Sequence, residues 1–147
     1  RHLGAAEIND LATSGMEIGS HGRDHAVLIR LSASGLNEEV GGSRDDLTKL
    51  LGTSPASFSY PYGTPDSYGP AAVEAVRLAG YASAVSTIVG ANRPGTSIYE
   101  LRRIPSYDSD TPNLTLARAR GAYDWTGRLQ GAWLKLFPHQ ATQKKDP

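Results

Sequence analysis

The chain has 147 residues, which is enough for one domain with a sizeable core but short of the roughly 200 that a closed (β/α) barrel needs. Fifteen basic and fifteen acidic side chains cancel, so we expect no electrostatic attraction to nucleic acid or to an anionic membrane. No apolar run approaches the roughly 20 residues of a membrane span, and the absence of cysteine excludes disulfides, thiolate metal sites and a cysteine nucleophile.

Hydrophobic spacing and capping residues predict helices that alternate with short strands. In chain order, the expected elements are a helix over Ala5 to Ser14, a strand over Met16 to Ser20, a helix from the N-cap Ser32 to Leu51, a strand over Ser57 to Tyr60, a turn-rich loop over Pro61 to Gly69, a helix from Pro70 that Gly80 ends, a strand over Tyr81 to Thr87 and a strand over Leu101 to Ile104. This alternation is typical of a parallel α/β layer.

The pattern changes after Pro105. Asp108 to Pro112 predicts a turn, and Leu114 to Leu136 predicts one helix in which Trp125 and Trp133 are interpreted as core or docking residues. The polar residues Gln140 to Pro147 are expected to be disordered. The predicted organisation is therefore a domain over residues 1–107, a helical extension over 108–139 and a disordered tail over 140–147.

A pair of histidines, His21 and His25, carries the strongest chemical signal. Two imidazoles four positions apart can face one metal ion, either on a helical turn or on a loop that folds back. Gly22 follows His21 directly and favours the turn. The pair would then lie at the carboxyl end of the preceding strand, where parallel-sheet enzymes place ligands. On spacing alone, a pair of surface-loop histidines fits as well.

Two later segments accompany the histidine segment. The three are Glu17-Ile18-Gly19-Ser20-His21-x3-His25, Phe58-Ser59-Tyr60-Pro61-Tyr62-Gly63 and Leu101-Arg102-Arg103-Ile104-Pro105. Together they resemble the polysaccharide deacetylase family (NodB-homology domains, carbohydrate esterase family four) over roughly residues 3–105. The resemblance implies an α/β fold, a partial distorted (β/α) barrel of the NodB-homology type with a C-terminal helical extension.

The resemblance also implies a chemistry: metal-dependent hydrolysis of the acetamide of an N-acetylated polysaccharide, with release of acetate. Members of the family hold a divalent metal, usually zinc, through two histidines and an aspartate, and a second aspartate is the general base. The histidines map onto His21 and His25. Pro61 and Tyr62 would bind the substrate, and the Tyr62 N–H would stabilise the oxyanion. The resemblance favours a secreted or cell-envelope-associated protein.

The sequence departs from the family pattern before and within the histidine motif. The family's paired aspartates precede the histidines on the first strand, and Asp10 does not fit because it lies inside a predicted helix. We therefore expect this chain, which does not begin with methionine, to be an incomplete catalytic domain. Gly22 stands where the family commonly has Ser or Thr, so we expect a looser turn there.

Two further departures concern the catalytic cation and the late catalytic histidine. Ser59 occupies a position where many members have an arginine; Arg103 would supply the catalytic cation instead, although Arg102 fits equally well. His139 is a weak counterpart of the late histidine. These departures leave an alternative function open, in which the chain is a non-catalytic carbohydrate-binding or remnant module of the same fold.

Overall fold

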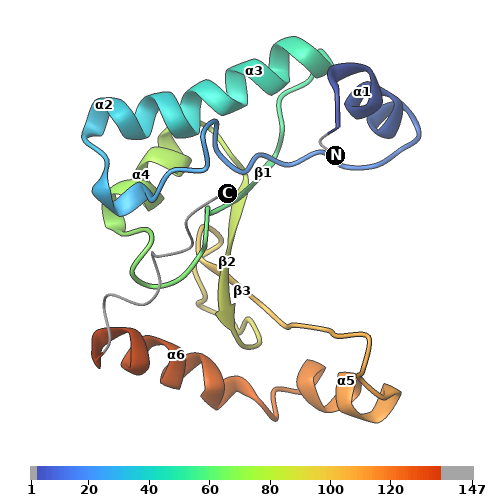
Figure 1. Cartoon of the computed structure of the whole chain (residues 1–147), viewed down its shortest axis with the longest axis vertical. Coiled ribbons are helices and arrows are strands. Elements are labelled where there is room, and N and C mark those ends of the chain that lie inside the picture. The colour runs from blue at the N-terminus through green and yellow to red at the C-terminus, as the bar shows by residue number, and fades with distance from the viewer. Residues whose placement is uncertain (1–2, 137–147) are drawn as a thin grey trace, which may run out of the picture.

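Three strands form a sheet at the centre of the molecule: β1 (Ser57–Ser59), β2 (Ser83–Val89) and β3 (Leu101–Arg103). They pair in the order β1-β2-β3, and both pairings are parallel. The computed structural model describes residues 3–136 of the chain (Figure 1). The predicted parallel α/β layer is confirmed, with β2 starting and ending two residues later than the sequence indicates.

The pairing of β2 with β3 is irregular between Val85 and Val89. Ser86 lies in this stretch and is fully buried, and its hydroxyl donates to the carbonyl oxygen of Leu101 at 3.1 Å. The Ser86 carbonyl oxygen in turn accepts a hydrogen bond from Nε of Arg103 at 2.5 Å. Ser86, in the middle of β2, is therefore bonded to both the first and the last residue of β3.

The first half of the chain is helical around this sheet. Its elements are α1 (Ala5–Thr13), the 3₁₀ turn η1 (Leu28–Arg30), α2 (Ala33–Leu36), the π-helical turn η2 (Asn37–Gly41) and α3 (Gly42–Leu51). The Ser32 hydroxyl accepts from the N–H of Gly35 at 3.2 Å, and Gly52 ends α3 with φ +71°, so both predicted ends are confirmed.

The expected single helix between these ends contains the π turn, and this changes which side chains face inward. Gly41 ends the turn and Gly42 follows it, and glycine is a poor helix former because it has the most backbone freedom to lose. Two consecutive residues, Glu39 and Val40, are both buried there. The buried Glu39 on this turn contacts the loop that carries His25.

The predicted strand over Met16 to Ser20 is wrong except at its last residue. Ser20 alone forms a parallel bridge, with Phe58 of β1. Met16 is 59 % exposed and Ile18 is only half-buried, so the segment buries little apolar surface against the sheet. Gly19 lies so close to β1 that a Cβ there would be 2.7 Å from the Ser57 hydroxyl oxygen.

The core lies between the sheet and the helix α4 (Pro70–Leu78), which begins with Pro70 as predicted. Phe58, Tyr60 and Tyr81 form its aromatic centre, with Phe58 in ring contact with both tyrosines. Burial of these rings and of the aliphatic side chains around them supplies most of the stabilisation of this half of the molecule.

The C-terminal region forms two helices, α5 (Pro112–Ala119) and α6 (Asp124–Leu136), in place of the predicted single helix over Leu114 to Leu136. Gly121 has φ +85° and interrupts the helical path. Figure 1 shows both helices on the other side of the strands from α2 and α3. Trp125 is 57 % exposed, so its interpretation as a core residue is wrong.

The side chain of Trp133, His139 and the tail over residues 140–147 lie outside what the structure describes. Between residues 3 and 136, no helix combines the length and the apolar character that crossing a membrane would require.

Candidate functional site

The first histidine of the motif is held at the carboxyl end of β1. Ser20 is bonded to β1 through both of its backbone groups, because its N–H donates to Ser57 and its carbonyl oxygen accepts from Ser59. His21 follows directly, and its Nδ1 lies 2.7 Å from the Ser59 carbonyl oxygen. Because a carbonyl only accepts, Nδ1 is the donor and Nε2 is left free to act as a ligand.

The second histidine faces the first and also faces the tyrosine of the next loop. The ring centroids of His21 and His25 are 4.8 Å apart with the planes at 73°, and those of His25 and Tyr62 are 4.7 Å apart at 64°. Three side chains that sequence analysis assigned to the site therefore lie together at one edge of the sheet. Tyr62 is 47 % exposed and both histidines are also exposed, so the site is open to solvent.

Backbone strain is concentrated in this cluster. Within residues 3–136, His25 and Tyr62 are the non-glycine residues with positive φ, at 55° and 62°. Such conformations cost of the order of 1–3 kcal/mol each and persist only where surrounding contacts impose them. The two strained residues are in ring contact with each other, so this edge of the sheet is the candidate site.

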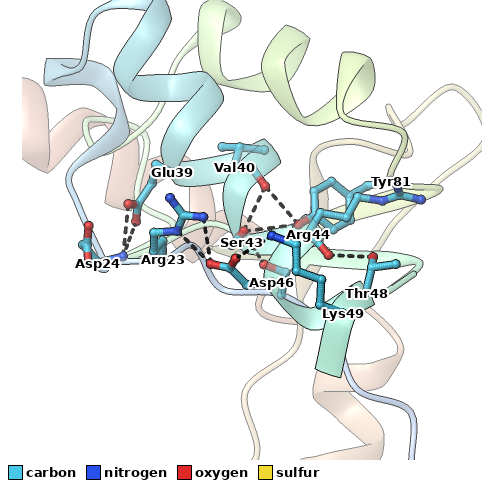
Figure 2. Close-up of polar contacts among 11 residues, drawn as sticks. Arg23, Asp24, Glu39, Val40, Ser43, Arg44, Asp46, Thr48, Lys49 and Tyr81 are labelled. Carbon is cyan, nitrogen blue, oxygen red and sulfur yellow. Dashed lines mark hydrogen bonds and ion pairs between the residues drawn. The ribbon is translucent and has the colours of Figure 1, made fainter. Parts of the chain in front are cut away.

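The turn that carries His25 is braced by a buried carboxylate. Glu39 is 4 % exposed, and its oxygens accept hydrogen bonds from the Asp24 N–H at 3.0 and 3.1 Å (Figure 2). Its Oε1 also accepts from the Ala26 N–H at 3.1 Å. A Cβ on Gly22, which has φ +85°, would lie 2.5 Å from Oε1 of Glu39. The expected looser turn at Gly22 is thus wrong: the turn is tightly enclosed, and Glu39 supplies the bracing that Ser or Thr would give.

Helix α3, which follows η2 directly, contacts the residues on either side of His21. The hydroxyls of Ser20 and Ser43 lie 2.8 Å apart in a buried contact, and Ser43 also contacts the Tyr81 hydroxyl at 3.3 Å. On the surface, Arg23 pairs with Asp46 of α3, with 2.8 Å between Nη2 and Oδ2. Figure 2 shows Arg23 paired with Asp46 on the side of α3 that carries Ser43. The residues before and after His21 are therefore attached to α3 at two points.

The loop that carries Tyr62 is bonded to the middle of the sheet. Thr87 of β2 donates its N–H to the Gly63 carbonyl and its hydroxyl to the Tyr62 carbonyl, both at 2.8 Å. A Cβ at Gly63, which has φ +66°, would lie 2.7 Å from the Thr87 nitrogen, so only glycine allows this approach. No hydrogen bond of the Tyr62 N–H is formed within residues 3–136, which leaves it available to an external acceptor.

Pro61 and Tyr62 have opposite exposures in this loop. The Pro61 side chain is fully buried and packs near Gly22, whereas Tyr62 presents its ring at the surface. Tyr60 anchors the loop from below: its hydroxyl donates to the Tyr99 carbonyl at 2.8 Å, and burial raises the pKa of Tyr60 well above its usual value. The hydroxyl therefore remains a neutral donor.

The structure separates the two candidate arginines. Arg103 bonds the carbonyl of Ser86 in β2, and that carbonyl lies next to Gly63, because a Cβ at Gly63 would be 3.2 Å from its carbon. Arg102 instead lines an open cavity of about 600 Å³ together with Arg93 and Asp124. Of the two, Arg103 is therefore the one bonded to the strand residue beside the Tyr62 loop.

The two histidines suit a divalent metal, but they make up only part of a ligand set. They supply two imidazole nitrogens, which suit zinc and other borderline metals, and the Ser59 carbonyl fixes the orientation of one ring as metal-ligating histidines require. In residues 3–136, no set of three His, Cys, Asp or Glu side chains is arranged to hold a metal. The described residues would thus supply two ligands to such a metal, and a third would have to come from elsewhere.

Sequence reasoning did not identify Glu39 as part of the site. Its position carries a signal nonetheless, because Leu36, Glu39, Val40 and Ser43 follow the i, i+3, i+4, i+7 spacing of a buried helix face. A charged residue at such a position indicates a specific polar partner, since an unpaired buried carboxylate is costly.

The chain belongs to the polysaccharide deacetylase family. The family model described as polysaccharide deacetylase matches residues 3–84, more than half of the chain. The predicted family and the NodB-homology type of fold are confirmed. No curated protein sequence is significantly similar to the chain.

Solved structures of deacetylases share the fold. The Streptococcus pyogenes deacetylase PplD, solved in complex with acetate, superposes with a TM-score of 0.73 at 22 % identity over 80 % of this chain and 51 % of PplD. BC0361, a polysaccharide deacetylase from Bacillus cereus, gives 0.67 at 22 % over 80 % and 36 %. IcaB from Ammonifex degensii gives 0.66 at 21 % over 80 % and 53 %. The chain therefore spans about half or less of the length of these proteins.

Proposed function

We propose that this chain forms the two-histidine part of a metal-dependent site that removes acetyl groups from an N-acetylated polysaccharide. The observation that carries the proposal is the edge contact of the His21 and His25 rings, 4.8 Å between centroids, with Nδ1 of His21 bonded to Ser59. Zinc is the first choice of metal, although a site of two imidazoles and a carboxylate also accepts cobalt, nickel and manganese.

The described residues have separate roles in this proposal. His21 and His25 would hold the metal, whose chemistry when bound is Lewis-acid polarisation of a carbonyl and a lower pKa for water. The N–H of Tyr62 would donate to the acetamide oxygen as charge develops on it. Arg103 would support the Tyr62 loop from below through the Ser86 carbonyl. The third ligand and the general base would come from outside the described cluster.

A polymeric substrate suits the shape of this edge. The two histidines and Tyr62 are all exposed at the carboxyl end of the strands, so a glycan chain can lie across them without entering a closed cavity. Family membership supports the substrate class.

The first test is metal binding by the chain itself. We expect zinc to bind and to release on chelation, and we expect His21→Ala or His25→Ala to lower the affinity at least tenfold, as measured by titration calorimetry. Both side chains are exposed, so the thermal unfolding midpoint should not move. Unchanged affinity in both variants would remove the ligand role.

The second test is acetate release from an oligomer of N-acetylglucosamine, with zinc, cobalt and nickel compared. Release that depends on His21 and on the metal supports the deacetylase. Binding of the oligomer without release under all three metals, in the full-length protein that carries this sequence, would favour the alternative of a non-catalytic carbohydrate-binding module.

A further inference from the structure

Glu39 is a buried acid whose partners are backbone amides. It is 4 % exposed on the π turn η2, and within residues 3–136 no Lys, Arg or His forms an ion pair with it. The nearby Arg23 is paired with Asp46 instead. Burying an ionised carboxylate is expensive unless hydrogen bonds replace the lost water, so the amide contacts of Glu39 account for its position.

Those amides bracket the second histidine of the site. Asp24 N–H lies 3.1 and 3.0 Å from the two Glu39 oxygens, and Ala26 N–H lies 3.1 Å from Oε1. Both N–H groups must point to one side for a single carboxylate to reach them, and this arrangement imposes the left-handed conformation, φ 55°, on His25 between them. Figure 2 shows the Glu39 carboxylate directed at the Asp24 backbone.

The direction of the His25 ring follows from that conformation. With φ positive, the side chain leaves the turn toward His21 on one side and Tyr62 on the other, at 4.8 and 4.7 Å between ring centroids. A turn free to return to negative φ would aim the ring elsewhere, because the Cβ direction rotates with φ.

We propose that Glu39 is a positioning residue of the histidine site: its carboxylate, bonded to the Asp24 and Ala26 amides, holds His25 against His21 and Tyr62. The part of this inference that concerns metal affinity rests on the proposed function. The part that concerns the placement of His25 does not, because it is argued from the amide bonds and the ring contacts alone.

The test compares Glu39→Gln with the control Val40→Ala in the full chain. Glutamine keeps the shape of the side chain but loses the negative charge, and it places an NH2 donor where Oε2 of the carboxylate accepts from the Asp24 N–H. Val40 is 0 % exposed on the same turn and belongs to the hydrophobic core, so Val40→Ala lowers stability by opening a cavity. The pair separates loss of positioning from loss of stability.

The first readout is NMR of the metal-free chain. In Glu39→Gln we expect the amide protons of Asp24 and Ala26 to move upfield as their charged acceptor is lost. We also expect the ring protons of His25 to shift as the ring leaves Tyr62. Val40→Ala should leave these signals unchanged while lowering the thermal midpoint by more than Glu39→Gln does. Unchanged His25 signals in Glu39→Gln, or equal changes in Val40→Ala, would overturn the proposal.

The second readout is zinc affinity, for which we expect a loss of about tenfold in Glu39→Gln and less than about twofold in Val40→Ala. The two readouts also separate the two proposals. If the unmodified chain binds no zinc, the proposed function fails while the NMR comparison still decides the role of Glu39. If the Glu39→Gln variant binds zinc as tightly as the unmodified chain does, the positioning role fails and the ligand role stands.

Discussion

The Nδ1 atom of His21 lies 2.7 Å from the carbonyl oxygen of Ser59, the last residue of β1. Because the carbonyl can only accept, the neutral imidazole must carry its proton on Nδ1 and keep the lone pair on Nε2. The end of a strand therefore sets the tautomer of this histidine, independently of any bound metal.

This contact predicts a defined tautomer for His21 in the metal-free chain. In a long-range ¹H–¹⁵N NMR spectrum at alkaline pH, Nδ1 should have the shift of a protonated ring nitrogen and Nε2 that of an unprotonated one. His25, whose described contacts are with the rings of His21 and Tyr62, serves as the internal comparison and should show a mixture. A His21 signal with the proton on Nε2 would contradict the contact with Ser59.

Replacing Gly22 by alanine should destabilise the fold more than the same change at Gly15. Both glycines have positive φ, 85° and 92°, which costs an alanine about 1–2 kcal/mol. At Gly15 nothing lies within 4 Å of the added Cβ, whereas at Gly22 it would meet Glu39 Oε1 at 2.5 Å. We expect urea unfolding to give a loss of about 1 kcal/mol for Gly15→Ala and about 2–3 kcal/mol for Gly22→Ala.

The difference between these two variants measures how firmly the Glu39 carboxylate is held. A side chain with free rotation would move aside at little cost, but Glu39 is bonded to two amides. Equal losses for Gly15→Ala and Gly22→Ala would show that the carboxylate yields.

Gly127→Ala should loosen helix α6 from the sheet. A Cβ at Gly127 would overlap the Val89 carbonyl oxygen at the end of β2, so the helix must shift away from the strand. We expect a loss of about 1–3 kcal/mol, as overpacking generally costs, and faster proteolytic cleavage within residues 120–136. Leu129→Ala, at a side chain that is 56 % exposed on the same helix, should leave cleavage unchanged.

The attachment of α6 should weaken in acid because it depends on Asp124. The Ala91 N–H, at 2.9 Å, and then Arg93 lower the pKa of this carboxyl below its ordinary 3.8. A group with a lowered folded-state pKa stabilises fully above its unfolded pKa, and the contribution is lost as the pH falls through the folded value. Cleavage within residues 120–136 should therefore be constant from pH 8 to 5 and rise below pH 3.8.

Asp124→Asn is the matched variant for that pH dependence. Asparagine retains an oxygen for the Ala91 N–H but loses the charge that faces Arg93. The acid-induced rise in cleavage should therefore be smaller in Asp124→Asn than in the unmodified chain. An equal rise in both would assign the pH dependence to another group.

Local signals in the sequence were sufficient where one residue decides the backbone. Ser32 caps the start of a helix with its hydroxyl, and the ring of Pro70 suits the first position of another. Gly52 ends a helix because it can adopt the left-handed conformation. The histidine pair was predicted at the carboxyl end of a strand, and His25 is in ring contact there with Tyr62, because the carboxyl ends of parallel strands coincide.

The errors arose where tertiary contacts decide. Met16 is apolar, yet it has no partner surface, and only Ser20 of the predicted strand pairs with β1. Helical spacing after Leu114 concealed the break at Gly121, where a single positive φ redirects the chain. Glu39 was missed because its role depends on amides 13 and 15 positions away, which no local pattern reveals.

The bridge between Ser20 and Phe58 has a consequence for how the chain folds. It brings His21 within bonding distance of Ser59 across 38 positions of sequence, and the helices α2 and α3 form within that span. Closing so long a loop costs chain entropy that only the later sheet contacts offset, and parallel pairing is slow for the same reason. A refolding chain should therefore acquire its helices early and bring its two histidines to Tyr62 only in the final kinetic phase.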